Sequence, residues 1–268
     1  MRRLFTTAEV HSTKHALAWA TEKKRVRSAG RGVYAVGAEP LTALDWARAD
    51  VLRSGREARG NLAGVLHGLD SVGLGGRPTR RDRLPDHMVV VLGGVRCADG
   101  LTTMADLAAT LDDLTWEQAL ESALRKTLTT VAALEGVRST RVRRVLALRP
   151  PGAPPTESLL ETLMVQLARD VPEVGELVRQ HEVRDEYDQL IARLDLSRPD
   201  LGFFFELDGE QHKGQPVYDA MRQTAVVAAT GWLPGRFTWT DVTRFPESTK
   251  RSLAALALRA TAIRRPSP

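Results

Sequence analysis

One stretch near the C-terminus, residues 192–209, limits the possible folds more than any other part of the chain. Its centre, Pro199-Asp200-Leu201-Gly202, is typical of a turn, because proline fixes φ and glycine accepts a positive φ. Apolar runs on both sides, including three consecutive phenylalanines, are typical of buried strands. The sequence therefore predicts a largely buried β-hairpin here.

Three acidic residues of this hairpin are expected to share one face. If the turn is centred between Asp200 and Leu201, Asp195 lies opposite Glu206. Asp208 then points the same way as Glu206, because side chains alternate along a strand. Crowded carboxylates repel one another, and a hard divalent cation such as Mg²⁺ would remove that cost. The pattern predicts a metal site held by Asp195, Glu206 and Asp208.

Length and composition set wider limits. A chain of 268 residues is long enough for two domains with their own cores, and 43% hydrophobic with 26% charged residues is ordinary for a soluble protein. No apolar run approaches the roughly 20 residues that span a bilayer, and we expect no signal peptide. Cys97 is the single cysteine, which excludes an intrachain disulfide and a thiolate metal cluster. We expect a cytoplasmic protein with no membrane segment.

Charge is unevenly distributed along the chain. Residues 1–150 carry 24 Lys and Arg against 16 Asp and Glu, whereas the remainder carries 14 against 17. A basic N-terminal part and an acidic C-terminal part suggest that one part grips a polyanion and the other collects cations. Chance variation in surface composition is the alternative. Four prolines within 149–155 mark the boundary, so we expect domains at 1–40, 41–149 and 155–268.

The first forty residues resemble a winged helix-turn-helix. Short helices are expected at 6–10 and 14–24, and the alternating, glycine-punctuated stretch 25–35 would form a β-wing. Helix N-termini and basic side chains are what such a module uses to hold phosphates and place a helix in the major groove. A solvated basic face is the alternative. The candidate DNA-binding residues of this module are Lys14, Lys23, Lys24, Arg25, Arg27 and Arg31.

The N-terminal half is similar to AbiEi-type antitoxins. The similarity lies in the stretches 31–37 (RGVYAVG), 63–69 (AGVLHGL) and 100–108 (GLTTMADLA), and it covers about residues 1–130. It implies a winged-helix unit followed by a small α/β domain, and DNA binding of the kind used in operon autoregulation. It also implies a toxin or defence-system partner, but it does not imply catalysis.

The C-terminal part, roughly 155–262, resembles the Vsr-like (very-short-patch-repair-like) branch of the PD-(D/E)XK nucleases. The matching pieces follow one another in the family's order: 158–161 (SLLE), 192–196 (ARLDL), 206–212 (ELDGEQH), 219–222 (DAMR), 231–232 (GW) and 236–242 (RFTWTDV). Two details depart from a literal reading. The "PD" at Pro199-Asp200 falls in the turn, so the family's strand aspartate corresponds to Asp195. The usual motif lysine is replaced by Asp208.

The resemblance implies metal-assisted phosphodiester hydrolysis. Asp195, Glu206 and Asp208 would hold one or two Mg²⁺ (or Mn²⁺) ions, and His212 would replace the lysine in moving protons, with Lys213 as a further candidate. Glu161 would reach the cluster from a helix, and Glu157 is the competing choice. Arg222 would contact a DNA phosphate, unless it only forms a surface ion pair with Asp219.

We therefore expect an α/β protein. A winged helix and a small α/β region would precede a restriction-endonuclease-like core, in which a mixed sheet is flanked by helices. That sheet would contain the hairpin 191–208 and a strand at 235–239, and the helices would lie at 157–169, 216–229 and 246–263. Trp232 and Trp239 are expected in its core.

The leading function is a Mg²⁺-dependent DNA endonuclease or nickase that serves phage defence or repair. The alternative is a non-catalytic DNA-binding regulator of the antitoxin type, in which the nuclease fold only adds contacts.

Overall fold

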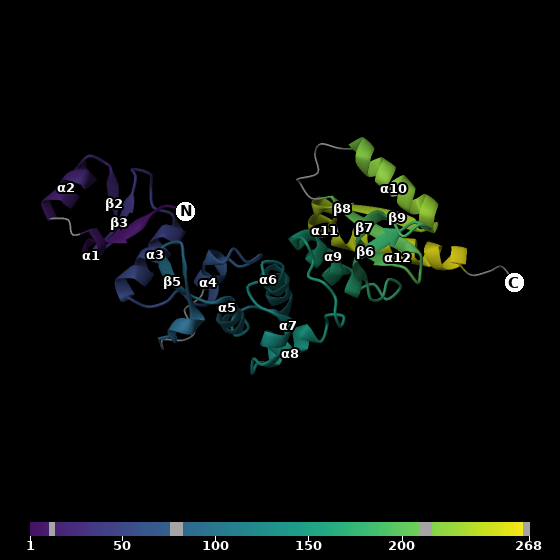
Figure 1. The fold of residues 1–268 in the computed structure, drawn as a ribbon, viewed down its shortest axis with the longest axis horizontal. Helices are drawn as coiled ribbons and strands as arrows, with labels where there is room; N and C mark the ends of the chain where they lie inside the picture. The colour runs from purple at the N-terminus through teal and green to yellow at the C-terminus, as the bar shows by residue number, and fades with distance from the viewer. Residues whose placement is uncertain (11–13, 76–82, 209–215, 265–268) are drawn as a thin grey trace. The chain divides into compact units, whose positions relative to one another are not determined.

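The computed structural model describes residues 1–10, 14–75, 83–208 and 216–264 (Figure 1). The chain is a mixed α/β protein that divides into two compact units, residues 1–146 and 147–268. The division falls a few residues before the proline-rich stretch that marks the expected boundary. Each unit is described by itself.

The first unit begins with a small antiparallel sheet of strand order β1-β3-β2. Its elements are β1 (Leu4–Thr6), α1 (Thr7–Val10), α2 (Lys14–Glu22), β2 (Val26–Ser28) and β3 (Val33–Val36). Lys24 adopts a positive φ of 55°, and the amide of Arg25 donates to the carbonyl of Ala20, so the chain reverses sharply between α2 and β2. This short reversal sets α2 beside the β2–β3 hairpin.

The remainder of the first unit is mostly helical. It contains α3 (Ala43–Ser54), α4 (Gly60–Leu66), a 3-10 turn (Asp86–Met88), β4 (Val89–Leu92), β5 (Val95–Ala98), α5 (Gly100–Leu107), α6 (Asp113–Arg125), α7 (Val131–Glu135) and α8 (Thr140–Leu146). The fully buried Trp116 of α6 donates its indole N–H to the carbonyl of Met104 at 3.0 Å. Buried side chains of α5, α6, α7 and α8 surround it to form one core cluster.

The second unit is built on one four-stranded mixed sheet of order β6-β7-β8-β9. Its strands are β6 (Val178–Arg184), β7 (Leu190–Arg198), β8 (Phe203–Asp208) and β9 (Leu233–Thr238), and its helices are α9 (Leu159–Arg169), α10 (Pro216–Thr230), α11 (Trp239–Arg244) and α12 (Pro246–Arg264). β6, β7 and β8 are antiparallel neighbours, whereas β9 runs parallel to β8. A parallel neighbour needs a crossover connection, and α10 provides it.

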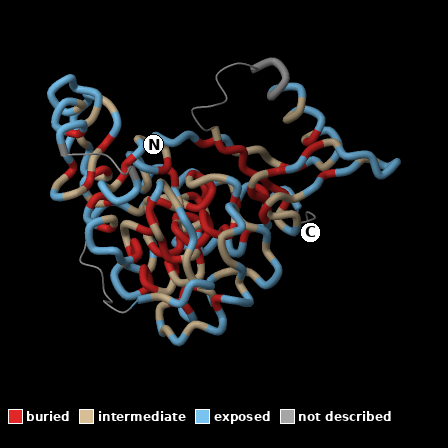
Figure 2. Tube along the Cα trace, turned by 60° about the vertical axis from the view of Figure 1, so that its left-hand side comes forward, coloured by how far each residue is buried: buried red, intermediate tan, exposed pale blue. Residues whose placement is uncertain are grey.

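Helices cover both faces of this sheet. Phe203 and Phe205 of β8 pack in one cluster with α9 and α12, while Phe204 packs in another with Val226 of α10. The phenylalanine run is therefore buried on both sides, as expected for a strand between two helical layers. Figure 2 marks the buried residues along the chain in red and the exposed residues in pale blue.

Most of the elements expected in the second unit are confirmed. The hairpin, the strand near 235–239 and the three helices all appear within a few residues of their expected bounds. β6 and the short α11 were missed. The core assignment holds for Trp232, which is 8% exposed, but it is wrong for Trp239, which is 43% exposed because it opens α11 at the surface. None of the described helices is long and apolar enough to cross a bilayer.

Candidate active site

The register of the hairpin places the acidic residues as the turn chemistry predicts. Leu196 pairs with Phe205 and Ser197 pairs with Phe204, so the next pair in the same register is Asp195 with Glu206. Gly202 takes a φ of 79°, which favours glycine. Asp200 lies in this turn, where its carboxylate pairs with Arg198 at 2.7 Å. The aspartate of the literal "PD" is thus a turn residue.

Asp195 lies where the regular alternation of the strand is interrupted. Leu194 packs with Phe204 and the α10 side of the sheet, whereas Leu196, two residues on, packs on the α9 side. The regular pairing between β7 and β8 stops at Leu196, and Asp195 Oδ2 instead accepts a hydrogen bond from the backbone N–H of Leu207 at 3.1 Å. The carboxylate therefore lies close to the plane of the sheet, between its two faces. The expectation that Asp195 shares one face with Glu206 and Asp208 is wrong, because the alternation of β7 is interrupted at this residue.

Gln180 of β6 sits opposite this interruption and is strained. Arg179 pairs with Leu196 and His181 pairs with Leu194, so Gln180 falls opposite Asp195 in the same register. Its φ is 52°, an uncommon conformation for a residue with a side chain, and its amide Nε2 donates to Glu161 Oε2 at 3.0 Å. Strain of this kind persists only when the surroundings impose it, and it often accompanies functional sites.

Glu161 enters the site from the first turn of α9. Ser158 caps the helix by accepting from the Glu161 N–H at 3.1 Å, and its hydroxyl donates to Glu161 Oε1 at 3.0 Å. Burial, to 5% exposure, raises the pKa of Glu161, and the negative charge of Asp195 raises it further. The competing residue, Glu157, is exposed and pairs with Arg193 at 2.7 Å. Glu161 is thus the buried member of the pair.

Glu206 enters from β8 and forms an ion pair with Arg222 of α10. Burial raises the pKa of Glu206 to about 7, the charge of Asp195 acts in the same direction, and Arg222 opposes both. Arg222 also donates to the carbonyl of Arg193 at 3.3 Å. The side chain of Asp219, its alternative partner from the sequence, lies outside the described residues. In this structure Arg222 binds a carboxylate of the cluster.

Asp208 lies two residues beyond Glu206 on the same face, at the end of β8. Its carboxylate forms an ion pair with Arg236 of β9 at 2.7 Å, and Arg236 is the residue paired with Glu206 across the parallel strands. The positive charge of Arg236 also favours ionisation of Glu206. An arginine therefore accompanies each of the two β8 carboxylates.

The structure thus brings four of the five expected catalytic residues to one region. The charge of Asp195 acts on both Glu161 and Glu206, and Asp208 lies two residues beyond Glu206 on β8. His212, with Lys213, lies outside the described residues. Among the side chains that are described, no group of three or more His, Cys, Asp or Glu residues is arranged to hold a metal ion. The donor chemistry suits a hard cation, but two of the oxygen donors are engaged by arginines.

Three site residues carry no clear sequence signal of their own: Gln180, Arg193 and Arg236. Arg236 stands in the motif-like stretch 236–242, and a basic residue one strand away from an acidic pair is the signal that would have found it. No sequence pattern points to Gln180 as a site residue, because the strand that carries it, β6, was not expected. Its place in the site follows from strand pairing alone.

The expected DNA-binding residues of the first unit lie around α2 and the β2–β3 hairpin. Lys23, Lys24, Arg25, Arg27 and Arg31 are all exposed. Arg25 stacks its guanidinium over the ring of Trp19 at 4.8 Å. The side chain of Lys14 is not among those described. Five of the six expected cations are therefore accessible to solvent.

Comparisons with models of protein families, with curated proteins and with solved structures found no match to this chain.

Proposed function

We propose that the second unit is a metal-dependent nuclease that hydrolyses phosphodiester bonds of DNA. The observation that carries this proposal is the position of Asp195, whose charge raises the pKa of both Glu161 on α9 and Glu206 on β8. Two buried carboxylates whose ionised forms are both disfavoured by the charge of a third are unfavourable for folding alone. Such an arrangement is more common at functional sites than elsewhere.

Mg²⁺ or Mn²⁺ is the proposed cofactor. Asp195 and Glu206 would hold it, with Asp208 as a further ligand and Glu161 adjoining the cluster. When bound, a divalent cation neutralises charge on the scissile phosphate and lowers the pKa of a coordinated water. Arg222 would exchange its ion pair with Glu206 for a phosphate oxygen of the DNA. Hydrogen bonds from Gln180 and Ser158 would keep Glu161 oriented towards Asp195.

We propose that the first unit supplies DNA binding through a winged-helix-like module. In support, two helices lead into a β2–β3 hairpin whose exposed side chains include Arg25, Arg27 and Arg31. Clustered arginine and lysine side chains bind phosphates and contribute most of the non-specific affinity for DNA. The proposal places the protein in the cytoplasm, acting on DNA in defence or repair, with a toxin or defence-system protein as a further partner.

Cleavage of supercoiled plasmid and of single-stranded DNA tests the nuclease proposal. The full chain should nick or cut DNA with Mg²⁺ or Mn²⁺ and should stop when EDTA is added. Asp195→Asn removes the central charge while keeping the shape, and it should lower the rate by about 100-fold or more. DNA binding, measured by fluorescence anisotropy, should remain within about twofold of the parent.

Asp200→Asn is the matched control, because it makes the same change in the same hairpin but in the turn. It should cut at the rate of the parent. If Asp195→Asn cuts as fast as Asp200→Asn, the site assignment is wrong. Cleavage that continues in EDTA would contradict the proposal that the nuclease needs a divalent metal ion.

A non-catalytic DNA-binding regulator is the second candidate. One observation favours it: Arg222 and Arg236 already neutralise Glu206 and Asp208 by direct ion pairs. In that case the arginines have a structural role and no metal enters. Manganese titration followed by electron paramagnetic resonance separates the two candidates, because the regulator would leave Mn²⁺ free in solution.

A further inference from the structure

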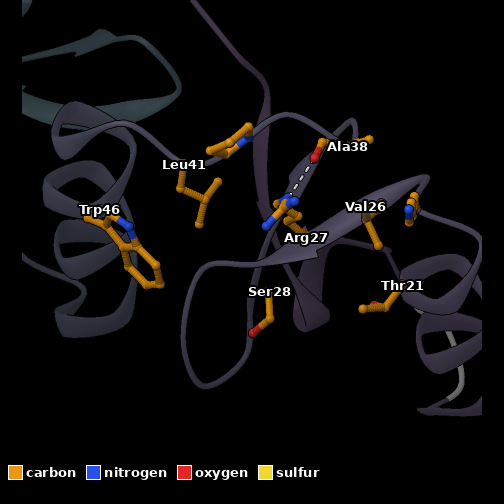
Figure 3. Close-up of a pocket in the computed structure, with 9 residues that line it drawn as sticks. Thr21, Val26, Arg27, Ser28, Ala38, Leu41 and Trp46 are labelled. Atoms are coloured by element: carbon orange, nitrogen blue, oxygen red, sulfur yellow. Dashed lines mark hydrogen bonds between the residues drawn. The ribbon is translucent and has the colours of Figure 1, made fainter.

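An open groove of about 350 Å³ lies in the first unit between the β2–β3 hairpin and the start of α3 (Figure 3). We call it the Trp46 groove. It is lined by Thr21, Lys24, Val26, Arg27, Ser28, Ala38, Pro40, Leu41 and Trp46. Its volume falls within the range of sites that hold small molecules.

The backbone fixes the walls of the groove. Arg27 reaches across the hairpin and donates its Nε–H to the carbonyl of Ala38 at 2.6 Å, and this bond orients the rest of the guanidinium. On the other side, Trp46 stands in the first turn of α3, which is held by a reciprocal capping box between Thr42 and Asp45. Figure 3 shows Trp46 and Leu41 on one side of Arg27, with Thr21 and Val26 on the other.

Two properties of the lining indicate its ligand. Trp46 is 45% exposed, although large aromatic side chains are usually well covered, so a flat apolar surface is available for stacking. Both charged residues of the lining, Lys24 and Arg27, are cations. The nearby Asp45 does not neutralise them, because it is 5% exposed and is engaged by Thr42 and Arg48. An aromatic face beside two cations is complementary to a base that carries a phosphate.

We propose that the Trp46 groove binds one unpaired nucleotide of DNA. The base stacks on the indole of Trp46, and Arg27 and Lys24 bind its phosphate. Stacking requires an accessible base face, which a nucleotide inside a duplex does not offer, so the groove recognises a single-stranded tail or an extruded base. The inference deepens the proposed DNA binding of the first unit and rests on it.

The test compares two labelled DNAs of the same duplex sequence in EDTA, one blunt and one with a short single-stranded tail. The full chain should bind the tailed DNA roughly tenfold more tightly, as one stacked base allows. Trp46→Ala should abolish that preference and leave the affinity for blunt duplex within about twofold. Trp46→Phe should retain most of the preference, because it keeps a stacking ring.

Trp19→Ala is the matched control. Trp19 is similarly exposed, at 47%, and lies on α2 outside the groove lining, so its loss should leave the tailed-to-blunt ratio unchanged. Free dAMP distinguishes the source of the nucleotide. If dAMP removes the tail preference, the groove accepts a nucleotide from any source, and if it does not, the nucleotide must belong to a DNA chain.

Equal affinity of the parent for blunt and tailed DNA would overturn the proposal, and so would an equal loss on both DNAs in Trp46→Ala. If the parent binds neither DNA but dAMP quenches tryptophan fluorescence in the parent and not in Trp46→Phe, the groove stands and the DNA-binding proposal fails. Absence of both signals refutes both.

Discussion

At the scale of single residues, the site is defined by which charges face one another. Asp195 accepts a hydrogen bond from Leu207 N–H, and its charge acts on Glu161 and Glu206. The pKa of Glu206 is strongly raised, because the carboxyl is buried and the ion pair with Arg222 offsets only part of the lost hydration. A carboxyl with a raised pKa in the folded state makes stability depend on pH.

Glu206→Gln tests this dependence. Folding raises the pKa of Glu206 to about 7, so the folded protein holds a proton that the unfolded chain releases. This contribution is fully present below the unfolded pKa and is lost as pH rises to about 7, so the unfolding free energy of the parent should fall across that window. The glutamine variant lacks the effect. Between pH 4 and pH 8 the parent should therefore lose about 3 kcal/mol of unfolding free energy that the glutamine variant does not lose.

Urea unfolding of both proteins in EDTA between pH 4 and pH 8 measures this difference. EDTA keeps the carboxylates free of metal, and the loss of the Arg222 ion pair affects mainly the offset between the curves. Parallel pH profiles for parent and variant would show that folding does not raise the pKa of Glu206.

At the scale of elements, local capping decides where the functional helices begin. Ser158 starts α9 and thereby places Glu161, while Thr42 starts α3 and places Trp46. In α6 the cap is Asp112, whose side chain accepts from the Thr115 N–H, although Thr115 is itself a residue type that caps helices. Aspartate and threonine are both good caps, so the choice between them depends on the next turn.

Thr42→Ala measures one of these caps. It removes the hydroxyl that accepts from the Asp45 N–H at 3.1 Å and disrupts the reciprocal box. The first unit should lose about 1 kcal/mol of unfolding free energy. Thr42→Ser keeps the oxygen and should retain nearly all of it. Equal losses in chemical denaturation of the two variants would show that the methyl group, not the cap, matters.

At the scale of the whole molecule, each unit has its own cores. The clusters around Trp116, Cys97 and Val33 contain only residues of the first unit, and those around Phe205 and Phe204 contain only residues of the second. Units of 146 and 122 residues, counted from the division after Leu146, are within the normal size of independent domains.

Expression of residues 1–146 and 147–268 as separate chains tests this independence. Each fragment should fold with a cooperative thermal transition and a circular dichroism spectrum typical of mixed α/β structure. The midpoints should lie within a few degrees of transitions in the full chain. A fragment without a cooperative transition would show that its core depends on the other unit.

The sequence by itself determined the hairpin, its turn and its register, because turn residues and two-residue alternation act over a few neighbouring positions. It also determined most helices of the second unit. It did not reveal β6, the strained Gln180, the arginines beside Glu206 and Asp208, or the exposure of Trp46. Those features depend on segments tens of residues apart meeting in space, and only the packed tertiary structure decides which of them meet.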